Sequence, residues 1–170
     1  MTFDSETYLS AAETARQTQD EAGPAVQITV LTFVWGQDWY ALPLSAVSEV
    51  IELERVTPIP GLPAHLLGAT NHRGEVMAVV DARPLLALLP GSVNANSYLV
   101  VINVEEELVG LLVDQVGDIH DVAQVPPTED DPHDHNHATA FSKVMMLDVE
   151  AQTLSLVNIT YLVEKILTAT

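Results

Sequence analysis

The chain has 170 residues, 48% of them hydrophobic, and carries 24 acidic against 6 basic residues, a formal net charge of −18. Such an acidic surface repels phosphate groups, which argues against binding to nucleic acid or to an anionic membrane surface. Cysteine is absent, which excludes disulfides, thiolate metal sites and cysteine nucleophiles and favours a cytoplasmic setting. The length predicts one domain with a sizeable core.

Residues 1–25 are expected to be a disordered N-terminal tail, because Ser, Thr, Gln, Ala and Glu dominate them and Gly23-Pro24 ends them. The first residues include Asp4 and Glu6 and lack a basic start and an apolar core, so a signal peptide is not expected. The longest apolar runs of the chain, such as 76–80 and 108–113, are too short for a transmembrane helix. Direct membrane insertion is therefore not expected.

A β-hairpin is predicted at the start of the folded part. Residues 28–35 are β-branched and aromatic, a turn containing Gly36 follows, and residues 39–42 return as a second strand that Pro43 ends. The apolar residues of the segment 44–53 lie at helical spacing, so a short helix is expected there.

A Gly-bounded turn is predicted at residues 68–74, leading into a strand at 75–81. This strand is apolar on both faces, which is typical of a buried position in a barrel or between two layers. Asp81 is expected to cap a short helix that carries Leu85, Leu86 and Leu89. A polar loop then runs to Ser97.

A second set of strands is predicted at 98–104, 108–114 and 116–125. Residues 126–140 are expected to form an acidic, His-rich loop, and residues 143–149 and 153–157 a last hairpin. Apolar residues at i, i+3, i+4, i+7 and i+8 from Ile159 predict a C-terminal amphipathic helix, with Asn158 as its N-cap.

The two sets resemble each other. The segment 31–53 aligns with 100–122 without a gap, and both segments read strand, short turn, strand and Val-x-(Glu/Asp)-(Val/Ile). A second alignment places 79–81 over 156–158 at a longer offset, and the His-rich loop accommodates the extra residues of the second copy. The repeat predicts two similar small β-units, each with a short helix after a polar cap.

No catalytic constellation is found in the sequence: it has no Gly-rich phosphate loop, no Gly-x-Ser-x-Gly elbow and no His-Glu-x-x-His helix. His133, His135 and His137, with neighbouring aspartates, could bind zinc or nickel, so a small metal-responsive binding protein is the alternative function. A solvated acidic loop explains the same residues, and no resident metal or cofactor is expected. His65, His72 and His120 are expected to be structural or surface residues.

Arg73 is one of only six basic residues and precedes the most apolar strand. Its guanidinium can hold a carboxylate through two parallel hydrogen bonds. Two roles stay open for it: an internal brace between the β-units, and a contact at a binding groove.

Four segments together resemble the CheW-like domain family: residues 41–51, 56–60, 67–83 and 108–116. The order of Asn-x-Arg-Gly, Val-Val-Asp and Val-Gly-Leu-Leu-Val-Asp-x-Val is the specific part, and the similarity covers residues 26–167. Three features depart from the family pattern, namely His72 in place of a hydrophobic residue, the acidic insertion after Pro126 and the strongly negative charge.

The resemblance implies a mainly β fold of two SH3-like, five-stranded β-barrels packed together, with short helices and a C-terminal helix. It implies a cytoplasmic, non-enzymatic adaptor that couples methyl-accepting chemoreceptors to a CheA-type histidine kinase, in chemotaxis or twitching motility. By the same pattern, Val47 and Glu49 would lie at the kinase-binding edge, and Arg73 near the receptor groove. Val100 is the expected groove residue in the second half.

Overall fold

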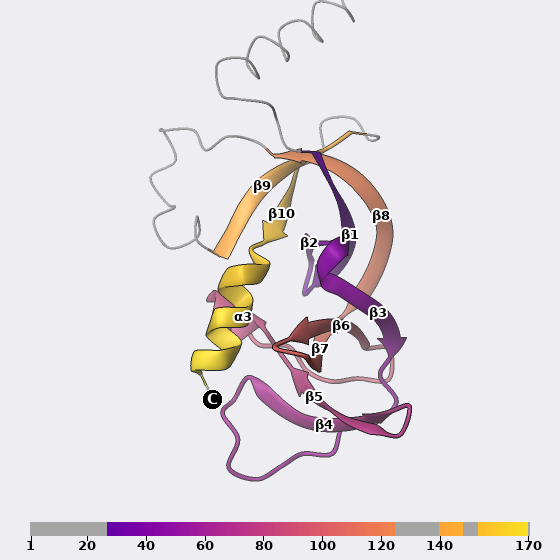
Figure 1. Cartoon of the computed structure of the whole chain (residues 1–170), viewed down its shortest axis with the longest axis vertical. Helices are drawn as coiled ribbons and strands as arrows, with labels where there is room; N and C mark the ends of the chain where they lie inside the picture. Colours follow the sequence, from indigo (N-terminus) through magenta and orange to yellow (C-terminus); the bar gives the residue numbers. More distant parts are fainter. Residues whose placement is uncertain (1–26, 125–139, 148–152, 170) are drawn as a thin grey trace, which may run out of the picture.

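The computed structural model describes residues 27–124, 140–147 and 153–169 (Figure 1). The tail expected at residues 1–25 lies outside these ranges, as do residues 126–139 of the expected His-rich loop, with His133, His135 and His137. Ten strands, two short 3₁₀ helices and a C-terminal α-helix make up the described part. The strands of the first half are β1 (Gln27–Trp35), β2 (Asp38–Pro43), β3 (Val47–Glu52), β4 (Leu66–His72) and β5 (Glu75–Val80).

The second half has the same number of strands, followed by the α-helix. Its elements are β6 (Tyr98–Val104), β7 (Glu107–Val113), β8 (Gln115–Gln124), β9 (Phe141–Met146), β10 (Thr153–Val157) and α3 (Ile159–Thr168). The 3₁₀ helices η1 (Leu44–Ala46) and η2 (Arg83–Leu86) both lie in the first half.

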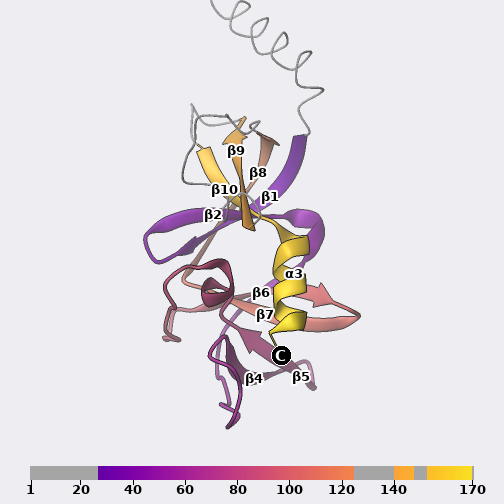
Figure 2. The same ribbon diagram turned by 90° about the vertical axis from the view of Figure 1, so that its left-hand side faces the viewer.

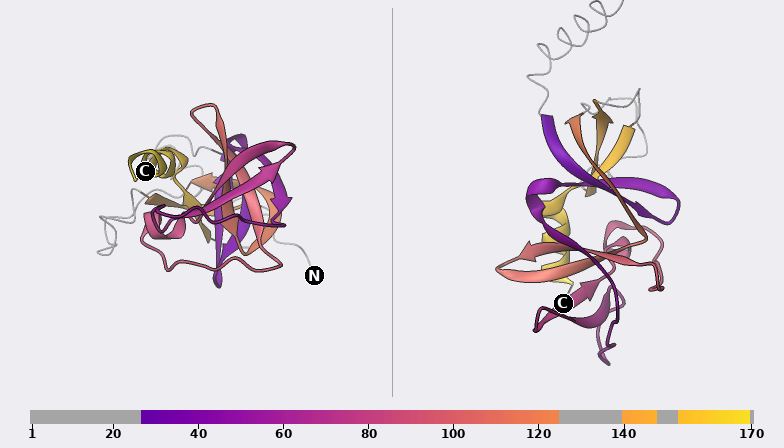
Figure 3. Two further views of the ribbon diagram at one scale, coloured as in Figure 1. Left: turned by 90° about the horizontal axis from the view of Figure 1, so that it is seen from below. Right: turned by 90° about the vertical axis from the view of Figure 1, so that its right-hand side faces the viewer.

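The strands form two five-stranded units stacked along the long axis of the molecule (Figures 1 and 3). One is a closed barrel in the order β1-β2-β10-β9-β8, here called the barrel. The other, here called the open sheet, has the order β3-β6-β7-β5-β4. The predicted mainly β fold with two five-stranded units is confirmed, and the second unit stays open between β3 and β4.

The two halves of the chain exchange strands between these units. The barrel takes β1 and β2 from the first half and β8, β9 and β10 from the second. The open sheet takes β3, β4 and β5 from the first half and β6 and β7 from the second. The register preserves the repeat: Leu31 pairs with Ile119 in the barrel, and their counterparts in the other copies, Val100 and Val50, pair in the open sheet. The parallel pairs β2–β10 and β5–β7 also correspond.

Three apolar clusters stabilise this arrangement. One fills the barrel around Val30, Val122 and Val144, and another lies within the open sheet around Met77 and Leu99. The largest lies between the two units and contains these buried residues, among others: Phe33, Trp35, Val80, Val100, Ile102, Leu111, Leu162 and Ile166. Figure 2 shows α3 running along the side of the molecule beside both units, where it buries Leu162 and Ile166.

Most predicted elements are confirmed with small shifts at their ends. The first hairpin, the three strands after Ser97, the last hairpin and the C-terminal helix are all present. The side chain of Asn158 caps α3 by accepting a hydrogen bond of 3.2 Å from the main-chain N–H of Tyr161.

The helix expected at residues 44–53 is wrong, because only Leu44–Ala46 form a 3₁₀ turn and Val47–Glu52 form β3. Alternate residues of β3 are half-buried and exposed, and β6 supplies an antiparallel partner along its length. Pairing with β6 therefore overrides a spacing that also fits a helix, and two valines and an isoleucine favour a strand. The turn expected at 68–74 is in fact mostly β4, and the turn itself is confined to Arg73 and Gly74.

Asp81 is not the N-cap residue of η2, although its carboxylate accepts a 3.2 Å hydrogen bond from the main-chain N–H of Arg83. It lies buried and holds the Arg83 side chain at 2.8 Å. Leu89 lies outside η2 and is 89% exposed. The strand β5 is less buried than expected, because Val76 at its start is 80% exposed.

Candidate functional site

The open sheet has an open edge between β3 and β4. These two strands end the open sheet on either side and share no ladder of hydrogen bonds. At one end of the gap, Thr57 and Ala69 exchange two main-chain hydrogen bonds, of 2.7 Å and 2.9 Å. The gap is therefore bounded at this end by a single main-chain bridge.

Side chains close the other end of the gap. Glu49 of β3 places its Oε1 2.7 Å from Nε2 of His72, and its Oε2 accepts a hydrogen bond of 3.1 Å from Nη2 of Arg73. The side chains of His72 and Glu49 are 16% and 24% exposed, whereas that of Arg73 is 77% exposed. One carboxylate thus connects both edge strands, and most of the arginine remains available at the surface.

The tight turn after β4 explains how Arg73 reaches Glu49. Arg73 and Gly74 have φ values of 53° and 82°, and His72 pairs with Glu75 across this two-residue connection. Positive φ at both central residues is the geometry of a type I′ hairpin, which matches the twist of the flanking strands. Asn71 supports the turn, because its Oδ1 accepts a hydrogen bond of 3.0 Å from the main-chain N–H of Gly74.

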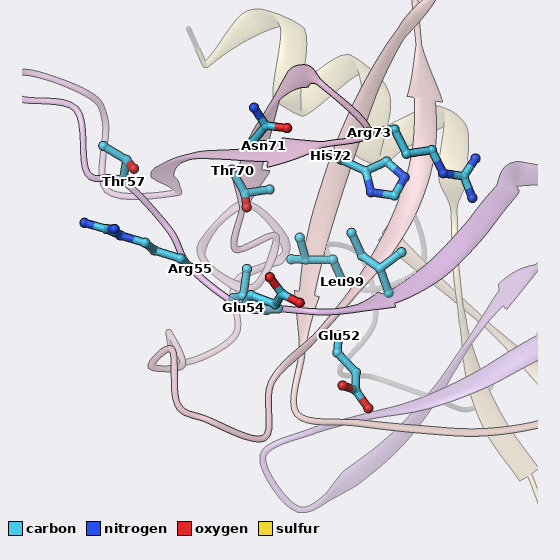
Figure 4. A pocket seen from close by; sticks show the side chains of 11 residues that line it. Glu52, Glu54, Arg55, Thr57, Thr70, Asn71, His72, Arg73 and Leu99 are labelled. Atoms are coloured by element: carbon cyan, nitrogen blue, oxygen red, sulfur yellow. The ribbon is translucent and has the colours of Figure 1, made fainter.

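A cavity of about 590 Å³ lies within the gap (Figure 4). In Figure 4 its side chains come from β4 above and from the end of β3 and the residues after it below, with His72 and Arg73 at one end and Arg55 at the other. The described residues contain three arginines, of which Arg83 is buried and the other two line this cavity. The cavity therefore concentrates the exposed guanidinium groups of a strongly acidic chain, beside Glu52 and Glu54.

A second cavity, of about 380 Å³, opens where β5 and β7 diverge. The two strands pair only from Ala78 and Val109 onward, so the start of β5 faces the β6–β7 turn across a cleft. Val76 is exposed there, and Glu75, Glu106 and Glu107 lie around it. The side chain of Val76 points to the same face of β5 as that of Val80, which belongs to the core between the units. At this cleft, the apolar face of β5 that enters the core between the two units is therefore exposed.

The structure brings together three of the four residues that the sequence singled out. Val47 and Glu49 lie on β3, and Glu49 contacts Arg73 directly. Val100 lies on β6 and is completely buried, so its side chain supports β3 from within. The surface residue opposite Val100 is Val50, which is 38% exposed and was not singled out.

The contact of His72 with Glu49 was not predicted, because His72 was expected to be a structural or surface residue. Its partner Glu49 lies 23 residues earlier, on a strand that was expected to be a helix. The two valines and the isoleucine of 47–52 were a signal for a strand there, but a strand assignment alone does not bring Glu49 to His72.

Among the described residues, no group of three or more His, Asp or Glu side chains could hold a metal ion. Within the same ranges, no helix has both the length and the apolar character needed to cross a bilayer.

The family model that matches this chain describes the CheW-like domain and covers residues 29–166. The chain belongs to the CheW-like domain family. A chemotaxis protein CheW of Rhizobium meliloti is 30% identical over 132 residues, 76% of this chain and 83% of the relative. A chemotaxis protein CheW of Klebsiella aerogenes is 32% identical over 98 residues, 58% of this chain and 59% of that protein.

The fold agrees with that assignment. The crystal structure of the scaffolding protein TtCheW from Thermoanaerobacter tengcongensis superimposes with a TM-score of 0.61. It is 18% identical, and the match covers 82% of this chain and 90% of that chain. The two proteins therefore share an overall fold at low sequence identity.

Proposed function

We propose that this protein is a non-enzymatic adaptor that couples methyl-accepting chemoreceptors to a CheA-type histidine kinase. Family membership over residues 29–166 and relatives named chemotaxis protein CheW support this proposal. The observation that carries it further is the surface cluster of Glu49, His72 and Arg73 at the open edge. In this cluster a partner would meet a carboxylate held by two neighbours and an exposed guanidinium, which suits binding and not catalysis.

The kinase contact is assigned to β3 and its edge. Val47 and Glu49 are half-buried, and Val50, which follows Glu49 on the other face of β3, is an exposed apolar side chain. An edge strand that carries an exposed apolar side chain and an ordered ion pair suits a modest interface in which the charges set specificity. Arg73 takes part in the same surface, because it holds Glu49 and is mostly exposed.

The receptor contact is assigned to the cleft between β5 and β7, next to the hairpin that carries Arg73. Exposed Val76 lies on the same face of β5 as Val80 of the core between the two units, and Glu75, Glu106 and Glu107 line the same cleft. An amphipathic helix could lay its apolar face on this cleft. Two modest contacts on one adaptor gain strength through avidity when receptors and kinases are clustered.

The experiment that tests the kinase contact is a binding titration of the full chain with the regulatory domain of the cognate CheA-type kinase. Glu49→Lys should weaken binding at least tenfold, about 1.4 kcal/mol, because it removes the carboxylate that both donors hold. Glu164→Lys is the matched control, since Glu164 is exposed on α3, remote from β3 in sequence. Equal affinities of the two variants, with circular dichroism spectra unchanged, would refute the assignment.

The receptor contact is tested by co-purification with a cytoplasmic receptor fragment. Val76→Asp should abolish recovery of the fragment, whereas Leu89→Asp, at another highly exposed apolar position, should not. Recovery with both variants would contradict the assignment of the cleft.

A further inference from the structure

A small cavity lies beside Trp39 at one end of the barrel interior. Trp39 lies on the same face of β2 as Ala41, which belongs to the core of the barrel. The cavity measures about 130 Å³, and the core residues Met146 and Leu154 line it together with Trp39. Trp39 is 46% exposed, whereas Met146 and Leu154 are buried. The cavity therefore combines a buried apolar floor with an exposed aromatic wall.

A β-bulge in β8 contributes the polar part of this cavity. Opposite Thr32 of β1, the strand β8 has two residues, Gly117 and Asp118, and all three line the cavity. The hydroxyl of Thr32 holds the bulge by donating a hydrogen bond of 2.8 Å to the main-chain carbonyl of Asp118. The six-membered ring of Trp39 lies against the position that a Cβ of Gly117 would occupy. The lack of a side chain at Gly117 thus lets the indole approach β8, close to the exposed residue Asp118.

The internal repeat indicates which chemical group is missing at Asp118. The alignment of the two copies places Glu49 over Asp118, and both strands have a bulge at this point. In the open sheet, Arg73 of the β4–β5 hairpin donates to the carboxylate of Glu49. In the barrel, the corresponding connection between β9 and β10, residues 147–152, has no arginine or lysine in its sequence. Among the described residues, the carboxylate of Asp118 has no ion pair or hydrogen bond.

We propose that the cavity beside Trp39 is a docking site for an arginine side chain of a partner protein. A guanidinium is planar and stacks on the face of a tryptophan ring, and it also pairs with a carboxylate through two parallel hydrogen bonds. Trp39 and Asp118 present these two groups at one cavity. Its volume suits the end of one side chain, because cavities that hold small-molecule ligands usually measure about 300–1,000 Å³.

The charge of the barrel also favours a cationic partner. Its strands carry three acidic residues, Asp38, Asp118 and Asp121, against one basic residue, Lys143. Asp38 is exposed and directly precedes Trp39. A negative surface attracts a positively charged segment and raises the rate of encounter. The proposal goes beyond the proposed function and does not depend on it, since the surfaces assigned to the kinase and the receptor lie on the open sheet.

The test is a titration of the isotope-labelled full chain with acetyl-Gly-Arg-Gly-amide, in physiological salt, followed by nuclear magnetic resonance. Matched peptides with lysine or glutamate in place of arginine are the controls for charge. The chain has two tryptophans, and their indole N–H resonances serve as reporters. Trp39 reports on the cavity, and the buried Trp35, whose indole donates to the carbonyl of Leu112, is the internal reference.

The arginine peptide should shift the Trp39 resonance with an affinity in the millimolar range and leave the Trp35 resonance in place. The lysine peptide should bind about threefold more weakly, because an ammonium group cannot stack or form the paired hydrogen bonds, and the glutamate peptide should not bind. Trp39→Leu, followed through the main-chain N–H of Asp118, should weaken binding of the arginine peptide about fivefold.

Two substitutions that remove the same charge from β8 separate a local contact from general attraction. Asp118→Asn should weaken binding of the arginine peptide about threefold, because Asp118 lines the cavity. Asp121→Asn should leave the affinity nearly unchanged, since Asp121 lies outside the cavity lining and accepts a hydrogen bond from Thr29. Equal losses in these two variants, equal affinity for the lysine peptide, or an unshifted Trp39 resonance would each overturn the proposal.

Discussion

Trp35 donates a hydrogen bond of 2.8 Å from its indole Nε1 to the main-chain carbonyl of Leu112. The tryptophan belongs to β1 of the barrel and the carbonyl to β7 of the open sheet, and the contact is buried between them. Trp35 also packs against Phe33 and Tyr40, at ring-centroid distances of 4.8 Å and 5.1 Å. The two units are thus joined by a directional bond as well as by apolar packing.

Trp35→Phe should lower the free energy of unfolding by about 1–3 kcal/mol, because it removes a buried hydrogen bond and part of a large aromatic surface. Denaturant unfolding measures the change. Trp39→Phe is the control, since Trp39 is 46% exposed and should cost less than Trp35. Equal losses in the two variants would show that the bond to Leu112 adds nothing.

The buried ion pair of Arg83 with Asp81 should be costly to break on one side only. Arg83 Nε lies 2.8 Å from Asp81 Oδ1, and both side chains are at most 4% exposed. Arg83→Met leaves a buried carboxylate without its counter-ion and should destabilise the protein by about 3–5 kcal/mol. The double variant Asp81→Leu with Arg83→Met should recover part of that loss in the same unfolding assay. A double variant less stable than Arg83→Met alone would contradict this account.

Gly68 should tolerate no side chain, because the main chain of Thr57 lies against the position of its missing Cβ and its φ is 143°. Gly68→Ala should therefore disrupt the Thr57–Ala69 bridge and destabilise the protein by more than about 2 kcal/mol. Gly36→Ala separates backbone strain from the clash: Gly36 has a φ of 65° with open space around it, and its loss should cost about 1–2 kcal/mol. Thermal unfolding compares the two, and a cost at Gly68 no larger than at Gly36 would disprove the clash.

His65 should make the protein less stable in mild acid. Burial lowers the pKa of the His65 ring below its ordinary value. Its Nε2 is buried and has no hydrogen-bond partner among the described residues. The unfolded chain therefore binds the proton more readily than the folded chain. Stability is fully present above the ordinary histidine pKa of about 6.5 and falls as pH drops below it, by at most about 1.4 kcal/mol per pH unit.

Unfolding at pH 7.5 and pH 5.5 measures this contribution. The unmodified chain should lose more stability over that interval than His65→Leu, whose side chain cannot titrate. The carboxylates titrate in both proteins, so the difference between the two isolates His65. An identical loss in both would exclude His65 as the cause.

The sequence predicts most strands correctly because their β-branched runs are interrupted by residues with strong turn preferences. Gly36 ends the first strand, and the alignment of 31–53 with 100–122 agrees with the observed pairs Leu31–Ile119 and Val50–Val100. The segment 44–53 could not be assigned in this way, since its spacing fits both helix and strand and the decisive partner, β6, lies in the other half of the chain.

The arrangement of the site could be predicted only in part. The resemblance to CheW-like domains suggested Val47, Glu49 and Arg73, and the structure groups them at one edge. The contact between His72 and Glu49 depends on a gap between two strands that do not pair, which no local pattern indicates. The burial of Val100 depends on packing between the two units, since both faces of β6 are covered.

The exchange of strands between the two halves has a consequence for how the molecule can be made. When only the first half of the chain has left the ribosome, two strands of the barrel and three strands of the open sheet are present. Neither unit has all of its strands at that stage. Folding of either unit must await the second half, and cutting the chain after β5 should yield no independently folded fragment. By the same reasoning, a protein with a single copy of the repeat would complete these units only by pairing with a second molecule. In the present chain, the two copies of the repeat lie in one polypeptide and complete both units together.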